Sequence, residues 1–253
     1  MKKIVDKPDL YDLLYEEVTE DIYMYLELLK DKTNILEFGA GTGRVTIPLA
    51  KDGHFIDAVD LSSEMLKTLK VKIQNDEFLK KHINPILGNM CEYVSQKKYD
   101  VILIPLTSFN YLLTEQEQEQ CLVSVKNNLL DKGFAIIELL SKNTFSDTNK
   151  TEKFTFIKRI NVDDDSYYDY YRNTMLDLEN RKIYQRRLFK YYMNNQFISE
   201  EELEWNNRFV TIEDFTILAN KVGLEIEQIY GNCKLDTYNQ NSEDVFIKVR
   251  RKK

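Results

Sequence analysis

The chain has 253 residues, 43% of them hydrophobic and 30% charged, which suits one sizeable domain with an insertion. Its formal net charge of −7 argues against a general nucleic-acid binder, so no nucleic-acid partner is expected. Three scattered cysteines without a C-x-x-C pair indicate reduced thiols in a cytoplasmic protein and offer no metal site. No membrane span and no signal peptide are expected, because no apolar stretch is long enough.

The first part of the chain alternates short apolar runs with amphipathic stretches. Residues 1–30 are predicted to be helical, because apolar side chains recur there at the spacing of one helix face. Beyond them, strands that each lead into a helix predict an open, doubly wound parallel sheet. The predicted strands are 34–38, 54–60, 83–87, 99–105 and 133–140, and the predicted helices are 44–52 and those starting at Ser62 and Thr114.

This alternation stops after residue 149. Residues 150–208 contain aromatic and β-branched runs without a helical pattern, and 178–181 has the character of a hairpin turn. These residues are predicted to form an inserted antiparallel sheet. Its many tyrosines could line a substrate cavity, contact a second subunit in a homodimer, or simply pack across neighbouring strands.

The remaining chain returns to the first sheet. A helix at 212–222 is predicted to precede strands at 224–230 and 243–249. Two strands joined without a helix run antiparallel. The predicted fold class is therefore α/β, with a seven-stranded sheet that ends in an antiparallel strand and with the inserted antiparallel sheet.

A glycine-rich turn follows the first predicted strand. Gly39, Gly41 and Gly43 fall at alternate positions, where they bring backbone N–H groups close to a ligand. Glu37, just before them, would repel a pyrophosphate and attract a cationic ligand. The dinucleotide fingerprint requires a third glycine three residues after the second. Arg44 stands at that position, so the fingerprint fails.

The segment E-F-G-A-G-T-G-R, which starts at Glu37, resembles motif I of class I S-adenosylmethionine-dependent methyltransferases. This resemblance implies S-adenosyl-L-methionine as the cofactor and a Rossmann-like, seven-stranded methyltransferase sheet. It also implies that the turn binds the cofactor through Glu37, Gly39, Ala40, Gly41, Gly43 and Arg44.

Two further turns extend the implied cofactor site. Asp60 ends the second predicted strand and is followed by Leu61; in this family a carboxylate there accepts hydrogen bonds from the ribose hydroxyls. An NAD enzyme would place an acid similarly, and a cap for the following helix is the alternative role, which can coexist with ribose binding. Asn89 and Met90 follow the third strand, where relatives place a partner for the adenine amino group and an apolar cover. Relatives commonly carry Asp where this chain has Asn89.

The segment P-L-T-S-F-N-Y-L after the fourth predicted strand resembles small-molecule methyltransferases of the amino-sugar and glycine N-methyltransferase group. It lacks the N-P-P-[YF] signature of enzymes that methylate nucleobase amino groups. The resemblance places Leu106 at the cofactor and Tyr111 near the acceptor. Glu138 is the candidate general base, with a strand-edge carboxylate paired to lysine as the alternative. His54 and His82 are expected at the surface, away from the site.

The N-terminal segment Y-D-L-L-Y places Tyr11 and Tyr15 one helical turn apart. In similar enzymes such a helix closes over the donor, which would bring Tyr15 to the cofactor; amphipathic packing is the alternative. The implied units are an N-terminal helical lid at 1–30, a cofactor-binding domain at 31–149 and 209–253, and the inserted sheet at 150–208.

The expected reaction is in-line methyl transfer to a small-molecule acceptor, an amine or a hydroxyl, governed mainly by positioning. A methyltransferase acting on a protein or RNA, and a protein that binds the cofactor without turnover, are the alternatives. An NAD(P)-binding oxidoreductase is less favoured. The sequence names neither the acceptor nor the attacking atom.

Overall fold

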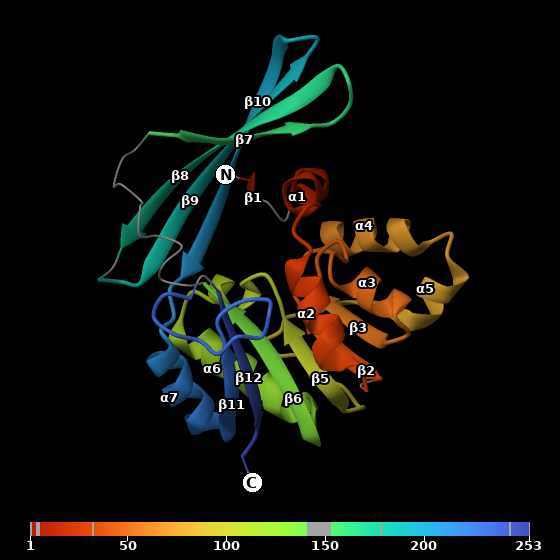
Figure 1. The fold of residues 1–253 in the computed structure, drawn as a ribbon, viewed down its shortest axis with the longest axis vertical. Coiled ribbons are helices and arrows are strands. Elements are labelled where there is room, and N and C mark those ends of the chain that lie inside the picture. Colours follow the sequence, from red (N-terminus) through yellow and green to blue (C-terminus); the bar gives the residue numbers. More distant parts are fainter. Residues whose placement is uncertain are drawn as a thin grey trace.

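A computed structural model describes residues 2–3, 6–31, 33–140, 153–177, 179–242 and 244–252. Its two sheets lie one above the other in Figure 1; most helices surround the lower, larger sheet, and α1 packs against the smaller one. The helices are α1 (Pro8–Tyr15), α2 (Glu20–Leu29), α3 (Thr46–Lys51), α4 (Ser63–Ile73), α5 (Glu77–His82), α6 (Glu115–Asn128), α7 (Ile212–Val222) and the short 3₁₀ helix η2 (Ser108–Tyr111).

The larger sheet has the strand order β11-β12-β6-β5-β2-β3-β4. Its pairs are parallel from β4 to β6, whereas β12 runs antiparallel to both β6 and β11. The predicted α/β fold with an antiparallel last strand is therefore confirmed. The strands are β2 (Asn34–Phe38), β3 (Phe55–Asp60), β4 (Ile83–Leu87), β5 (Tyr99–Ile104), β6 (Leu129–Leu139), β11 (Leu224–Tyr230) and β12 (Val245–Arg251).

Both faces of this sheet are buried, because successive residues of a strand point to opposite sides. On β5, Ile102 and Ile104 join the core formed with α6 and α7. Val101 and Leu103 point to the other side, into the core formed with α2, α3 and α4. This double burial explains the unbroken apolar run from which the strand was predicted.

The smaller sheet has the order β1-β10-β9-β8-β7, and its members other than β1 follow one another as antiparallel hairpins. Asp177 and Lys182 pair at the turn between β8 and β9, as predicted for 178–181; Leu178 itself lies outside the described residues. The strands are β1 (Lys2–Lys3), β7 (Thr155–Asn161), β8 (Ser166–Asp177), β9 (Lys182–Met193) and β10 (Gln196–Arg208).

The structure departs from the sequence-based expectations in several places. Residues 2–3 form β1, which pairs in parallel with β10, although this region was predicted to be helical. Strand β10 and helix α5 were not predicted. His54 is only 4% exposed, so its expected surface position is wrong. The tight connection from α3 to β3, in which the His54 N–H donates to the Leu49 carbonyl, presses residue 54 against the helix.

None of the helices in the described residues has both the length and the apolar character that a membrane crossing requires. Within the same residues, no group of three or more His, Cys, Asp or Glu side chains is placed to hold a metal ion.

Candidate active site

The glycine turn lies at the carboxyl ends of the parallel strands. Gly39, Gly41 and Gly43 have φ values of +73°, +56° and +89°, the left-handed region that favours glycine. A Cβ added at Gly39 would lie 2.6 Å from the Ser108 Oγ, so only glycine lets the turn approach η2. A Cβ at Gly41 would meet nothing within 4 Å, which leaves open space beside this part of the turn.

Glu37 is the buried carboxyl group beneath this turn. It is 1% exposed, and its Oε2 accepts a 2.6 Å hydrogen bond from the Thr46 hydroxyl at the start of α3. Burial raises the pKa of Glu37 to about 8, against the opposing effects of Thr46 and Arg44. Glu37 therefore holds a proton at neutral pH, and a cation bound nearby would favour its ionised form.

This raised pKa predicts a pH dependence of folding. Between about pH 5 and about pH 7.5 the folded chain keeps a proton on Glu37 that the unfolded chain has lost. The free energy of unfolding should therefore fall with rising pH, by up to about 1.4 kcal/mol per pH unit from this group. Urea unfolding of Glu37→Gln should show a shallower slope across this range. The exposed Glu77 provides the control, because Glu77→Gln should leave the slope unchanged; equal slopes in wild type and Glu37→Gln would contradict the assignment.

Asp60, at the end of β3, connects two elements of the predicted cofactor site. Its Oδ2 accepts from the Gly41 N–H at 2.8 Å and its Oδ1 from the Ser62 N–H at 2.7 Å. Burial raises the pKa of Asp60, and these backbone donors oppose the shift. The helix cap considered for Asp60 is provided by Ser62, whose hydroxyl accepts from the Met65 N–H. Leu61 beside it is 75% exposed, unusual for a leucine.

Asn89 and Met90 form the turn after β4, at the same edge of the sheet. The Asn89 side-chain oxygen accepts a 3.0 Å hydrogen bond from the Cys91 N–H, which shapes the turn. Met90 is half-buried against the core on the α6 side. The Asn89 side-chain amide NH₂ donates to no protein acceptor in the described part of the chain.

Two contacts fasten the N-terminal helices to the glycine turn. Arg44 donates to the Asp21 carboxylate at 2.6 and 2.8 Å and to the Val18 carbonyl at 2.8 Å, so its side chain anchors α2. The Thr42 hydroxyl donates to Asp12 of α1 at 2.5 Å. The sequence did not predict that Asp21 contributes to the site. Asp12 was noted only as a member of the Y-D-L-L-Y segment.

The loop after β5 is strained and is held by Glu138. Leu106 and Thr107 have φ values of +47° and +57°, which side-chain-bearing residues rarely adopt. The Leu106 N–H donates to the Glu138 Oε2 at 2.7 Å, and no lysine pairs with Glu138 among the described residues. Burial raises the pKa of Glu138 to about 8, with the nearby Asp21 adding to the shift.

Tyr111, at the end of η2, lies in different surroundings from Glu138. Its ring centroid is 5.5 Å from that of Trp205, in the cluster that joins α1 to the inserted sheet. Burial raises the Tyr111 pKa well above 10, so the phenol can donate a hydrogen bond but cannot act as a base at neutral pH. Tyr15, on the same face of α1 as Tyr11 and 4.9 Å from it between ring centroids, also contacts Trp205.

These residues fit S-adenosyl-L-methionine. The space beside Gly41 admits a ligand at the carboxyl ends of the strands, where α/β folds bind nucleotides. Asp60 stands at the end of β3, which pairs with β2, and Asn89 follows β4, the next strand of the sheet, so all three turns lie at the same edge. Within the turn, the Arg44 side chain pairs with Asp21 and the Ala40 side chain is buried in the core, so these two residues present backbone groups rather than side chains.

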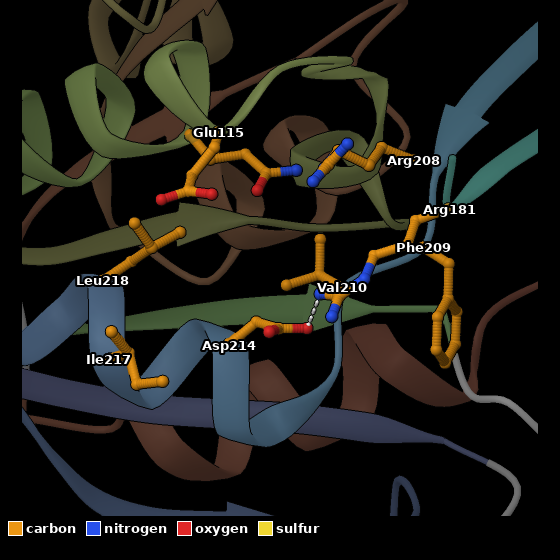
Figure 2. Close-up of a pocket in the computed structure, with 9 residues that line it drawn as sticks. Glu115, Arg181, Arg208, Phe209, Val210, Asp214, Ile217 and Leu218 are labelled. Atoms are coloured by element: carbon orange, nitrogen blue, oxygen red, sulfur yellow. Dashed lines mark hydrogen bonds and ion pairs between the residues drawn. The ribbon is translucent and has the colours of Figure 1, made fainter. Parts of the chain in front are cut away.

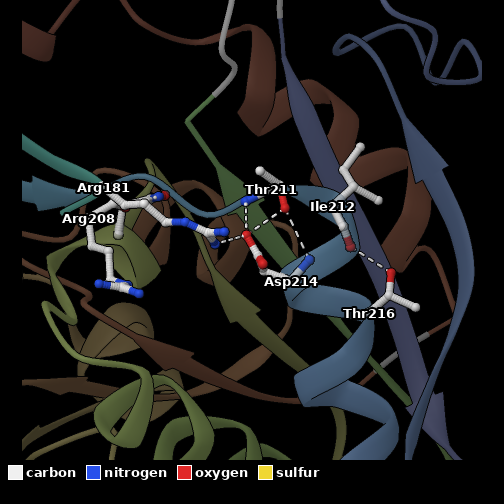
Figure 3. Close-up of polar contacts among 7 residues, drawn as sticks. Arg181, Arg208, Thr211, Ile212, Asp214 and Thr216 are labelled. Atoms are coloured by element: carbon white, nitrogen blue, oxygen red, sulfur yellow. Dashed lines mark hydrogen bonds and ion pairs between the residues drawn. The ribbon is translucent and has the colours of Figure 1, made fainter. Parts of the chain in front are cut away.

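A cavity of about 160 Å³ lies apart from the predicted site residues (Figure 2). Arg181, from the turn between β8 and β9, pairs there with Asp214, and this ion pair holds the pKa of Asp214 at about 2. Figure 3 shows that Asp214 also completes the cap of α7 with Thr211. The arrangement ties the inserted sheet to α7. The cavity is lined by Glu115, Gln118, Arg181, Arg208, Phe209, Val210, Asp214, Ile217 and Leu218.

Residues 35–133 match the family described as Methyltransferase domain, a stretch that contains the glycine turn, Asp60 and Asn89. With the seven-stranded sheet, this match shows that the chain contains a methyltransferase domain of the S-adenosyl-L-methionine-dependent type. The YqeM protein of Bacillus subtilis, which is named as a methyltransferase, is 21% identical over 228 residues, covering 89% of this chain and 87% of that protein.

Two solved structures show the same fold along nearly the whole chain. A S-adenosylmethionine-dependent methyltransferase from Clostridium acetobutylicum has a TM-score of 0.79 at 19% identity, covering 96% of this chain and 97% of its own. An amino pentose methyltransferase from Micromonospora echinaspora has a TM-score of 0.71 at 14% identity, with coverages of 93% and 91%. Both alignments cover more than 90% of this chain, so they extend beyond residues 35–133 and into the inserted sheet.

Proposed function

We propose that this methyltransferase acts on a small molecule, an amine or a hydroxyl compound, bound between the glycine turn, α1 and the inserted sheet. The observation that carries this proposal is the double attachment of α1. Asp12 bonds to Thr42 of the glycine turn, while Tyr15 accepts a 3.1 Å hydrogen bond from Arg187 of β9. Helix α1 therefore links the donor side to the inserted sheet, and Figure 1 shows it between that sheet and α4.

The cofactor roles carried over from the family follow the turns of the larger sheet. Bound S-adenosyl-L-methionine supplies a methyl group on a positively charged sulfur. The glycine turn and Glu37 would hold its amino-acid end and Asp60 its ribose hydroxyls. Asn89 would bond to the adenine, with Leu61 and Met90 covering the ring. The exposed Leu61 supports this last role, because a bound ring would bury it.

Positioning supplies most of the rate in this proposal. Tyr111 donates a hydrogen bond that orients the acceptor, while α1 and the tyrosines of the inserted sheet exclude water. Glu138, with a pKa of about 8, is mostly protonated at pH 7, and its ionised fraction, which grows as the pH approaches 8, can accept a proton from an amine or hydroxyl. It also holds the Leu106 N–H, so it positions the acceptor loop.

The acceptor class is supported by one structural neighbour, the amino pentose methyltransferase, which acts on an amino sugar. We also propose that the chain works in the cytoplasm and that the inserted sheet carries the contact of a homodimer. Apolar side chains on the far part of that sheet are exposed and support such a contact; they are Phe156, Met193, Phe197 and Ile198.

A transfer assay tests the acceptor. Primary amines and phenols that carry a carboxylic acid group, together with the matching amides, are incubated with the protein and S-adenosyl-L-methionine. Release of S-adenosylhomocysteine is then measured. Methylation of at least one small molecule is expected, and binding of the cofactor without any turnover would contradict the proposal. Tyr111→Phe should lower kcat/KM about tenfold, the effect of one lost hydrogen bond, with unchanged cofactor affinity.

A further inference from the structure

Arg187 is a buried cation on the inward face of the inserted sheet. The inward row of β9 is Ile183, Gln185, Arg187 and Phe189, and Arg187 is only 7% exposed within it. A guanidinium stays charged in proteins and is costly to bury without a partner. A sequence signal for this position existed, because the alternation of β9 places a charged residue where apolar ones are expected.

No carboxylate pairs with Arg187 among the described residues. Arg44, Arg159 and Arg186 each pair with an acid, namely Asp21, Asp169 and Glu202. Arg187 instead donates to two neutral oxygens, the Tyr15 hydroxyl and the Gln185 amide, both at 3.1 Å. Its Nε–H is buried without any acceptor in the described chain. A guanidinium has five N–H donors, and these two hydrogen bonds use one on each Nη, so the charge and a set of donors that includes the Nε–H are left for a ligand.

The surroundings of Arg187 place this unused donor at the acceptor side of the site. The guanidinium carbon lies 3.4 Å from the ring centroid of Trp205, which in turn contacts Tyr15 and Tyr111. Tyr15 is on α1, the helix that bonds to the glycine turn, and Tyr111 ends the loop that follows β5. Aromatic walls with one buried polar group are typical of small-molecule sites.

We propose that Arg187 binds a carboxylate group of the methyl acceptor. The planar fork of a guanidinium presents paired N–H donors that match the two oxygens of a carboxylate, and a buried, charge-assisted pair of this kind fixes orientation. This inference rests on the proposed function, since it names the class of acceptor that the same site would take. The acceptor is then an amino acid or a hydroxy acid, held by its carboxylate with the reacting group directed to the donor.

Trp205 is the only tryptophan of the chain, so its fluorescence reports on Arg187 without labelling. The protein is titrated with acetate, with acetamide as the neutral isostere, and with inorganic phosphate, all at constant ionic strength. Acetate is expected to change the Trp205 emission saturably, and acetamide and phosphate are not. Equal responses to acetate and acetamide, or a response to phosphate alone, would overturn the carboxylate assignment.

Two arginines on adjacent positions of β9 provide matched variants. Arg187→Met should abolish the acetate response or weaken it at least about tenfold, the loss of one charge-assisted pair. Arg186→Met removes the same charge from the opposite face, where Arg186 pairs with Glu202, and should keep the response. Arg187→Lys keeps the charge but not the fork and should give an intermediate affinity. An acetate response that survives in Arg187→Met refutes the proposal.

The transfer assay separates this inference from the function on which it rests. Acids are expected to be methylated in preference to their amides, and Arg187→Met should remove that preference while cofactor affinity stays unchanged. Methylation of acids and amides at equal rates would overturn the role of Arg187 and leave the proposed function standing. Absence of any small-molecule methylation would overturn the function itself.

Discussion

Gly39→Ala is expected to lower the affinity for S-adenosyl-L-methionine at least about 100-fold, equivalent to about 2.7 kcal/mol. The new Cβ would lie 2.6 Å from the Ser108 Oγ and 2.9 Å from its Cβ, so the glycine turn and η2 must separate. Ser108 cannot move freely, because its hydroxyl donates to the Pro105 carbonyl at 2.7 Å. Isothermal titration calorimetry measures the affinity, and thermal unfolding shows whether the variant is folded.

Gly53→Ala is the matched control. Gly53 has a φ of +97°, so alanine introduces a similar backbone strain of about 1 kcal/mol there. A Cβ at Gly53 would meet nothing within 4 Å, and the residue lies between α3 and β3, at the opposite edge of the sheet. Both variants should lose stability, but only Gly39→Ala should lose binding. Equal cofactor affinities in the two variants would show that the turn does not form the binding site.

Asp60→Asn should weaken cofactor binding by about 10-fold to 100-fold, the effect of losing one or two hydrogen bonds to a charged acceptor. The carboxylate accepts from both the Gly41 and Ser62 N–H groups, and an amide would turn an NH₂ toward one of them. The glycine turn would lose its anchor to β3, and the ribose hydroxyls would lose a charged acceptor. Calorimetric titration with S-adenosyl-L-methionine gives the effect.

A second aspartate of β3 separates binding from stability. Asp57 is buried, accepts from the Tyr99 hydroxyl and pairs with Lys97 at 2.9 Å. Asp57→Asn should therefore lower the free energy of unfolding by about 1–3 kcal/mol with little change in cofactor affinity. If Asp60→Asn destabilises the fold to the same degree without weakening binding, Asp60 serves only as a loop anchor.

Much of the larger sheet could be predicted from local patterns. β2, β4, α7 and β11 have the predicted bounds, because their apolar residues and flanking turn residues are contiguous in sequence. The inserted sheet was recognised by its aromatic and β-branched runs. β10 was missed, because most of its first half is acidic or exposed and it becomes a strand by pairing with β9. β1 was missed for the same reason, since a strand of two residues exists only through its partner.

The candidate site also has parts that the sequence predicted and parts that it did not. The motif identified the glycine turn, and the ends of β3 and β4 follow from strand order. The ion pair between Arg44 and Asp21 could not be predicted, because these residues are 23 positions apart and meet only when α2 packs on α3. The raised pKa values of Glu37 and Glu138 depend on burial, which the sequence does not state.

The sequence alone determined the sheet's class and its antiparallel ending, because hydrophobic periodicity acts over a few neighbouring residues, and the resemblance of its glycine turn to motif I implied the cofactor. Only the tertiary structure decided which charges are paired. Asp12 bonds to the glycine turn, and Arg187 stacks on Trp205 with no carboxylate partner in the part of the chain that the structure describes; both arrangements come from contacts between segments distant in the chain. Burial and pairing of charges are properties of the packed molecule, so the acceptor side of the site emerged only from the fold.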